Sequence, residues 1–269
     1  MAVDKKIILI TGANSGIGYR ASFAIANASP SNHVVMTARS AAKGTAALAE
    51  LQARNPAGTL SFLELDVTSD ASIAAAAERV EADFGKLDVL INNAGVTESI
   101  RLADKERARL TRDEFLRVFD TNVFGSYLLT QALEPLLRKA SSSGGGGAGG
   151  RRPIILNVSS GLGSVDMRTK HDHMWTQFLF DCYRMSKSAL NMMTVGFQWH
   201  FREWANVFAF DPGFTMSNLT GPEDVETRRA MGADSGEMAT AGILDILDGK
   251  RDKDIKLLVS NDENKVYAW

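Results

Sequence analysis

Near its start the chain reads Lys6-Ile7-Ile8-Leu9-Ile10-Thr11-Gly12-Ala13-Asn14-Ser15-Gly16-Ile17-Gly18. A buried parallel strand is a continuous apolar run because both of its faces are covered, and residues 6–10 have that character. The glycines behind the run permit a tight turn and a close approach of a ligand, and a helical pattern follows at once. The free N–H groups of that helix favour a phosphate above the turn. A glycine-rich turn alone is often only a tight turn, but strand, turn and helix together predict a dinucleotide site.

The composition is that of an ordinary globular protein. Hydrophobic residues make up 45% and charged residues 23% of 269 positions. The net charge of −2 gives no reason to expect nucleic acid or an anionic membrane as a partner. Cys182 is the single cysteine, which excludes an intrachain disulfide and favours a reducing compartment. We interpret its thiol as packing and expect a cytoplasmic protein, since no apolar run reaches the length of a membrane span.

Apolar runs and helical patterns alternate along the whole chain. Strands are expected at residues 6–10, 33–39, 60–67, 87–95, 154–160, 207–210 and 256–260, and further helices at 41–54, 69–84, 111–139 and 183–204. This alternation predicts one α/β domain over residues 1–269, a Rossmann-like doubly wound parallel sheet of about seven strands with helices on both faces. The Ser/Gly-rich residues 141–150 are expected to form a mobile loop on the face away from the chemistry.

Ligands of such sheets lie at the carboxyl ends of the strands, so the strand ends give candidate site residues. The second strand ends at Ala38-Arg39, without the acid that would bind a ribose 2′-hydroxyl. A guanidinium suits a 2′-phosphate, which favours NADP(H) over NAD(H), although an exposed surface arginine is the alternative. The third strand ends at Asp66-Val67, where the carboxylate can meet the adenine amino group or cap the following helix.

The fifth strand ends in Ser159-Ser160, and Tyr183 and Lys187 open the helix that follows. Their i, i+4 spacing places phenol and ammonium on one face of the helix. A lysine beside a phenol lowers the pKa of the phenol, which can then transfer a proton near neutral pH. The pair alone is often an exposed helical pair. Its position after Ser160 in a nucleotide-binding sheet indicates catalysis instead.

Several motifs occur in the order typical of one family: Thr11-Gly12-x-x-x-Gly16-x-Gly18, Asp66-Val67, Asn92-Asn93-Ala94-Gly95, Asn122, Ser160, Tyr183-x-x-x-Lys187 and Pro212-Gly213. With them, essentially the whole chain resembles the short-chain dehydrogenases/reductases. Three stretches are most similar to the NADPH-dependent carbonyl reductases of that family: residues 37–39, 87–95 and 266–269.

The resemblance implies roles for particular residues. Tyr183 would be the acid/base, and Lys187 would lower its pKa and hold the nicotinamide ribose. Ser160, rather than Ser159, would orient the substrate oxygen, and Asn122 would position a water that relays protons to Lys187. NADP(H) would be held by Gly12, Asn14, Ser15, Gly16, Ile17, Gly18, Arg39, Ser40, Asp66, Val67, Asn93, Ala94, Gly95, Tyr183, Lys187, Pro212, Gly213, Thr215 and Ser217.

Within that implied set, Arg39 and Ser40 would contact the 2′-phosphate, Asp66 and Val67 would flank the adenine, and Asn93 would contact a ribose. Ser217 stands where the family often has threonine, so a hydroxyl is retained.

Two segments depart from or vary within the family. Ser160 and Tyr183 are 23 positions apart, more than the family usually has, so residues 161–182 are expected to be an inserted segment that shapes the substrate pocket. Residues 218–234 are expected to form a substrate lid. We interpret His171-Asp172-His173 as surface residues and predict no metal site. In related reductases, an insertion before the helix that begins at Tyr183 can obstruct the family's dimer contact. The choice between monomer and homo-oligomer is therefore open.

The resemblance implies hydride transfer from the 4-pro-S position of NADPH to a ketone, aldehyde or quinone, with Tyr183 as proton donor. The aromatic residues of the insertion suggest a bulky apolar substrate. Alternatives are oxidation of a secondary alcohol with NADP, a different reaction such as imine reduction, and a non-catalytic NADP-binding protein. A pure binding protein has no need of the set Asn122, Ser160, Tyr183 and Lys187.

Overall fold

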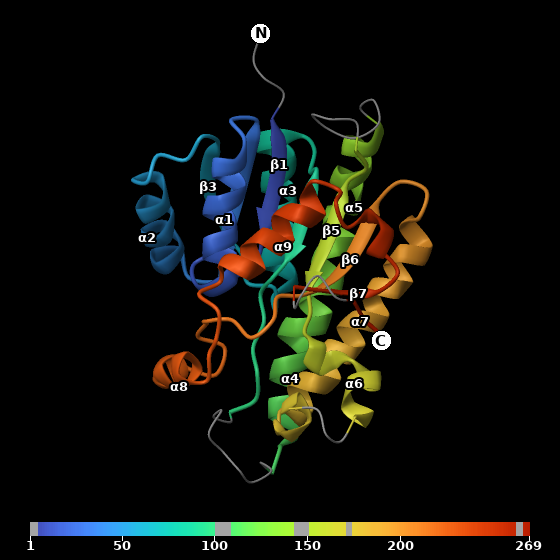
Figure 1. Cartoon of the computed structure of the whole chain (residues 1–269). Coiled ribbons are helices and arrows are strands. Elements are labelled where there is room, and N and C mark those ends of the chain that lie inside the picture. Colours follow the sequence, from blue (N-terminus) through green and yellow to red (C-terminus); the bar gives the residue numbers. More distant parts are fainter. Residues whose placement is uncertain (1–4, 100–108, 143–150, 171–173, 262–265) are drawn as a thin grey trace.

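A computed structural model describes residues 5–99, 109–142, 151–170, 174–261 and 266–269 of the chain (Figure 1). Its centre is one eight-stranded sheet in the order β3-β2-β1-β4-β5-β6-β7-β8. The strands are β1 (Lys6–Ile10), β2 (Asn32–Ala38), β3 (Thr59–Glu64), β4 (Val89–Asn92), β5 (Ile154–Val158), β6 (Asn206–Asp211), β7 (Leu258–Ser260) and β8 (Val266–Tyr267). All pair in parallel except β8, which is antiparallel to β7.

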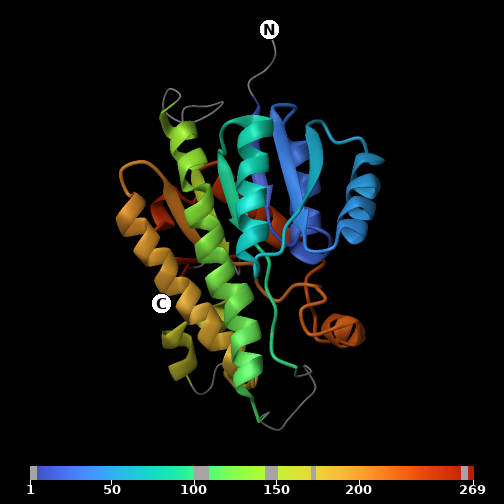
Figure 2. The ribbon, with the colours of Figure 1, turned by 180° about the vertical axis from the view of Figure 1, so that it is seen from behind.

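Helices cover both faces of the sheet. In the described residues they are α1 (Gly16–Ala28), α2 (Ala41–Gln52), α3 (Asp70–Phe84), α4 (Arg112–Phe119), α5 (Ser126–Ser142), α6 (Val165–Thr169), α7 (Asp181–Phe201), α8 (Val225–Ala230) and α9 (Glu237–Leu247). Helices α1 and α9 lie on one face (Figure 1), and α3, α5 and α7 lie on the other (Figure 2).

Alternate residues of β1 explain why its sequence is apolar throughout. Ile8 packs in the core that contains Ile25 of α1, whereas Leu9 packs in the core that contains Leu133 of α5. Successive side chains of a strand point to opposite faces, so a strand between two helical layers has no solvent-facing position. The predicted doubly wound sheet is confirmed.

The structure differs from the sequence expectation in several places. Helices α6, α8 and α9 and the short strand β8 occupy stretches for which no element is predicted. Strand β8 adds only two residues, too few to leave a periodic pattern. Residues 141 and 142 of the expected loop belong to the last turn of α5, and residues 143–150 lie outside the described residues.

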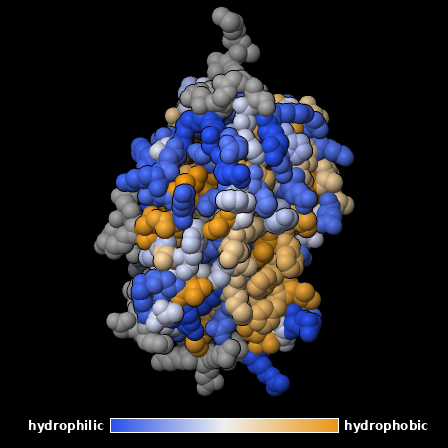
Figure 3. Space-filling model, turned by 90° about the vertical axis from the view of Figure 1, so that its right-hand side faces the viewer, coloured by the Kyte–Doolittle hydropathy of each residue, from blue (hydrophilic) through white to orange (hydrophobic). Residues whose placement is uncertain are grey.

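One side of the molecule carries a cluster of exposed apolar side chains (Figure 3). Met192 and Trp199 on α7 are 72% and 67% exposed, and Tyr127 and Leu128 on α5 are also exposed. Among the described residues, no helix has both the length and the apolar character to cross a membrane.

Candidate active site

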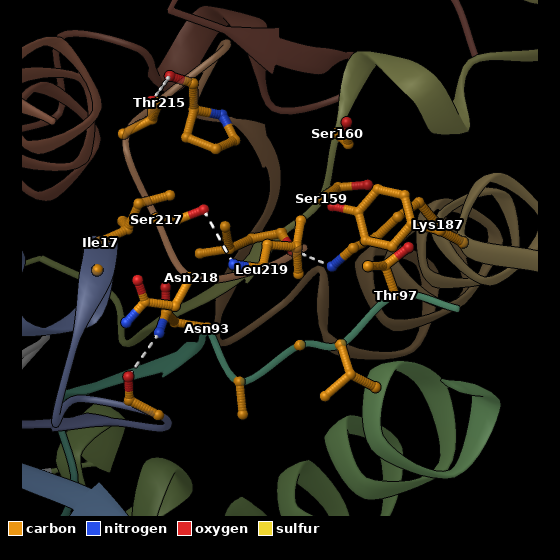
Figure 4. Close-up of a pocket in the computed structure, with 18 of the residues that line it drawn as sticks. Ile17, Asn93, Thr97, Ser159, Ser160, Lys187, Thr215, Ser217, Asn218 and Leu219 are labelled. Carbon is orange, nitrogen blue, oxygen red and sulfur yellow. Dashed lines mark hydrogen bonds between the residues drawn. The ribbon is translucent and has the colours of Figure 1, made fainter. Parts of the chain in front are cut away.

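A cavity of about 770 Å³ opens at the carboxyl ends of β1, β4, β5 and β6. Figure 4 shows Asn93 and Ser160, which follow β4 and β5, together with Lys187 of α7 and Ser217 of the loop after β6 around this cavity. The cavity brings together all of the predicted site residues except two. Gly18 and Asn122 do not line it.

The turn after β1 is built for a close ligand. Gly12 and Gly16 have φ angles of +63° and +58°, a left-handed conformation that favours glycine. Ser15 is exposed at the start of α1, and its hydroxyl makes no capping bond to the helix. The first N–H groups of α1 and this hydroxyl therefore face the cavity as donors for an anion.

Gly18, a predicted cofactor contact, does not line the cavity. A Cβ at this position would lie 2.5 Å from Nδ2 of Asn93 and 2.7 Å from the carbonyl oxygen of Gly12. Glycine here lets α1 pack closely against the turn, behind the cavity wall. Asn93 fastens the same turn, since its Nδ2 donates to the carbonyl oxygens of Thr11 at 2.7 Å and Gly12 at 3.2 Å.

The end of β2 presents cations to the cavity. Arg39 is exposed, and Ser40 caps α2 by accepting from the N–H of Lys43 at 3.4 Å. Lys43, in the first turn of α2, also lines the cavity and is not among the predicted residues.

The end of β3 decides between the two interpretations of Asp66. Ser69 caps α3 by accepting from the N–H of Ser72 at 3.3 Å, so Asp66 is not the helix cap. The Asp66 carboxylate accepts from the N–H and hydroxyl of Thr68, at 3.0 and 2.7 Å, and these bonds lower its pKa. Asp66 also lines the cavity, which leaves the adenine contact as the prediction.

Tyr183 and Lys187 lie one turn apart on α7, and both are buried. Nζ of Lys187 donates to the carbonyl oxygen of Val158 at 2.8 Å and lies 5.5 Å from the ring centroid of Tyr183. Ser160 lines the same cavity as Tyr183, and its side chain favours the ionised form of the phenol. Ser159 instead donates to Oδ1 of Asn191 at 2.5 Å, which favours Ser160 as the residue beside the phenol.

Burial dominates the protonation of this pair. It raises the pKa of Tyr183, with the field of Asp211 acting in the same direction, and the side chain of Ser160 opposes the shift. Burial also lowers the pKa of Lys187 to about 8. The lowering of the Tyr183 pKa by Lys187, which the resemblance implies, stays a prediction. A phenol that keeps its proton at neutral pH suits a proton donor.

Asn122 lies in a π-helical turn, Asp120–Gly125, between α4 and α5. Its amide accepts from the N–H of Val96 at 2.8 Å and donates to the carbonyl oxygen of Val96 and the hydroxyl of Ser186, both at 2.9 Å. A Cβ on Gly95 would lie 3.5 Å from Oδ1 of Asn122 and 3.6 Å from Nζ of Lys187. Gly95 therefore leaves open the space between these two groups, where the water relay is predicted.

The inserted segment lines the remaining part of the cavity. Leu162, Met167, Phe178 and Phe180 face it, and the rings of Phe178 and Phe180 stack with centroids 6.3 Å apart. The described residues of the segment thus form part of the cavity wall, and their role in shaping the substrate pocket stays a prediction. Residues 171–173, which include both histidines, lie outside the described residues.

Residues 218–234 form the opposite wall and contain α8. Phe214 and Met216 bond to Asp234 through backbone hydrogen bonds of 2.8 Å each, which pin the two ends of the segment together. Asn218, Leu219, Thr220 and Arg228 line the cavity from this segment. Its position over the pocket agrees with a substrate lid, and closure of the lid stays a prediction.

A family model described as short chain dehydrogenase matches residues 6–227. The chain is a short-chain dehydrogenase. The relatives of this dehydrogenase include the short-chain dehydrogenase anuI of Penicillium roqueforti, which is 34% identical over 96% of this chain and 98% of its own length.

Solved structures support the same assignment. The NADPH-bound carbonyl reductase from chicken fatty liver is 29% identical, with a TM-score of 0.79 over 98% of this chain and 99% of its own. The carbonyl reductase Sniffer of D. melanogaster is 25% identical, with a TM-score of 0.78 over 98% and 100%. The protein is therefore an oxidoreductase with similarity to carbonyl reductases.

Glu98 is a residue of the dehydrogenase that the sequence analysis missed. It is only 2% exposed, and its carboxylate accepts from the N–H groups of Cys182 and Tyr183, both at 2.9 Å. Phe180 at the N-cap position of α7 offers no side-chain acceptor. The missing cap residue was the only signal, and it does not say which distant residue replaces it.

Cys182 itself agrees with the packing interpretation. The thiol is buried, and burial raises its pKa to about 11. A thiol that stays protonated is a poor nucleophile.

We expect the rate of carbonyl reduction by this dehydrogenase to fall above about pH 8. Tyr183 keeps its proton over this range, whereas Lys187 loses its proton with a pKa of about 8. Reduction consumes a proton, so loss of the ammonium removes the group that resupplies the phenol, and oxidation of the alcohol should rise over the same interval. Profiles of kcat/KM against pH in both directions measure this. A falling limb that persists in Lys187→Met would assign it to another group.

Proposed function

We propose that this short-chain dehydrogenase is an NADPH-dependent carbonyl reductase. The observation that carries the proposal is the buried phenol of Tyr183 in the cavity wall, with Ser160 lining the same cavity and Nζ of Lys187 5.5 Å from the phenol ring centroid. Such a group donates a proton at neutral pH, which reduction needs. The NADPH-bound neighbour from chicken liver supports the choice of cofactor.

The residues of the cavity fit an NADP(H) molecule. Gly12 and Gly16 give the backbone a form that a pyrophosphate can approach, beside the exposed hydroxyl of Ser15. Arg39 and Lys43 place two cations where a 2′-phosphate would lie, and no acid occupies that end of β2. When bound, the cofactor supplies the hydride.

The chain's own residues supply the proton and the geometry. Ser160 orients the substrate oxygen, and Tyr183 donates its phenolic proton to that oxygen as the carbonyl becomes an alcohol. Lys187 then returns a proton to Tyr183, and the Asn122 side of the cavity supplies the water path. Residues 161–182 and 218–234 exclude bulk water from the two sides of the pocket.

NADPH oxidation, followed by its absorbance over a panel of ketones, aldehydes and quinones, tests the proposal. Turnover that prefers NADPH to NADH is the expected result. Turnover only with secondary alcohols and NADP would select the dehydrogenase direction. NADPH binding without any turnover would select a non-catalytic binding protein.

Arg39→Asp should shift the cofactor preference toward NADH. The substitution removes a charge-assisted bond to the 2′-phosphate and adds an acceptor for a 2′-hydroxyl, so kcat/KM with NADPH should fall by about 10-fold to 100-fold. Kinetics with both cofactors measure the shift. Arg112→Asp, at an exposed position outside the cavity, is the matched control. An unchanged preference in Arg39→Asp would make Arg39 a surface residue without a role in recognition.

A further inference from the structure

The substrate end of the cavity contains a cation that the proposed mechanism does not use. Arg228 projects from α8 in the lid segment and lines the same cavity as Tyr183. It is 5% exposed, whereas its neighbour Arg229 has a side chain that is 63% exposed and forms an ion pair with Glu226. Arginine side chains are usually exposed, as that of Arg229 is, so the burial of Arg228 is unusual.

The contacts of Arg228 orient it without neutralising it. Its Nε donates to the hydroxyl of Thr220 at 3.3 Å, and one terminal nitrogen donates to the carbonyl oxygen of Thr215 at 3.1 Å. These neutral acceptors use only part of the guanidinium's fork of donors. Within the part of the chain that the structure describes, no carboxylate forms an ion pair with Arg228.

The buried charge of Arg228 favours an anion at this point. Burial lowers the pKa of Arg228, and the fields of Tyr183 and Asp224 oppose that shift. Burial removes water from the guanidinium, which costs free energy, and no ion pair with a carboxylate offsets that cost. An anionic ligand would offset it. Two further acids line this part of the cavity: Asp211 accepts from the N–H of Gly213 at 3.2 Å and the hydroxyl of Ser260 at 3.1 Å, and Asp234 accepts from the N–H groups of Gly236 at 2.7 Å and Met238 at 3.2 Å.

The remaining wall is apolar. Leu162, Phe178, Phe180 and Phe214 line the substrate end, and the Arg228 guanidinium lies 5.4 Å from the Phe214 ring centroid. This lining suits the body of an apolar molecule, with one cation at its edge.

We propose that the substrate is an anionic carbonyl compound, whose apolar body packs on these aromatic side chains and whose carboxylate, or another oxygen anion, pairs with Arg228. This inference rests on the proposed function, because it names the substrate class of the same site. It also amends the expectation of a purely apolar substrate. The fork of the guanidinium matches two oxygens of one carboxylate, which orients the carbonyl toward Tyr183.

A pair of matched substrates tests the inference: carboxybenzaldehyde and its methyl ester, which differ in charge but not in the reacting group. In Arg228→Gln, kcat/KM should fall about 30-fold or more for the acid and less than about 3-fold for the ester. Arg228→Lys keeps the charge without the fork and should recover part of the loss. Arg229→Gln is the control and should change neither substrate.

Three outcomes would overturn the inference. Equal losses for acid and ester would make Arg228 a structural tie of the lid. A raised KM for NADPH with every substrate would assign it to a cofactor phosphate. Benzoate that binds the NADP-loaded wild type and Arg228→Gln equally by calorimetry would exclude an anion site, and this binding arm gives a result even if no carbonyl is turned over. If the ester is reduced but Arg228→Gln affects acid and ester equally, the proposed reductase function stands and the anionic-substrate inference fails.

Discussion

Replacement of Tyr183 by phenylalanine should lower kcat for carbonyl reduction by about 10²-fold to 10⁴-fold. The substitution removes only the phenolic oxygen and leaves the buried ring in place. Without a proton donor the negative charge that develops on the substrate oxygen is left to Ser160 alone. Steady-state kinetics with a substrate from the panel measure the loss.

The binding of NADPH should separate loss of chemistry from loss of structure. We expect the affinity for NADPH, followed by its fluorescence, to change little in Tyr183→Phe, because the glycine turn and the cations of β2 and α2 are untouched. Tyr127→Phe is a matched control, since Tyr127 is 46% exposed on α5 and does not line the cavity. Retention of most of the activity in Tyr183→Phe would rule out the assigned proton donor.

Glu98→Ala should lower the free energy of unfolding by about 2–4 kcal/mol. The carboxylate satisfies two buried N–H groups, of Cys182 and Tyr183, and each donor left without a partner costs about 1–3 kcal/mol. The negative charge of the carboxylate also interacts favourably with the positive end of the α7 helix dipole. The melting temperature should fall by roughly 5–10 °C.

Activity should respond as well, because Glu98 holds the backbone of the residue that bears the phenol. We therefore expect kcat for reduction to fall in Glu98→Ala, with a smaller loss in Glu98→Gln, whose carbonyl oxygen still accepts one N–H. Glu203→Ala, at a side chain that is 82% exposed beyond the end of α7, is the control and should shift stability by less than about 0.5 kcal/mol. A normal melting temperature in Glu98→Ala would show that solvent or another group caps α7.

The local sequence pattern was sufficient to predict the central strands of the sheet. Each central strand is an apolar run because helices cover both faces, as Ile8 and Leu9 illustrate by entering different cores. The turn after β1 and the pair Tyr183 and Lys187 are short-range motifs, so their spacing carries the information. The rule that ligands lie at the carboxyl ends of strands then pointed to Arg39, Asp66 and Ser160, all of which line the cavity, and the family resemblance implied the further cofactor contacts.

The protonation of Tyr183 and Lys187 depends on burial, which the sequence alone does not give. Proximity alone suggests that Lys187 lowers the pKa of Tyr183, but burial raises one pKa and lowers the other. Burial depends on what covers the pair, the lid and the inserted segment included. That cover is not a property of a four-residue spacing.

The sequence therefore determined the strands, the glycine turn and the catalytic motif, because these features depend on residues that are close together in the sequence. The tertiary structure alone placed Glu98 on the N–H groups of α7 and Arg228 in the wall of the cavity. It also moved Gly18 behind that wall. Each of these depends on contacts with residues far away in the sequence, such as Tyr183 for Glu98 and Asn93 for Gly18, and no local periodicity records such contacts.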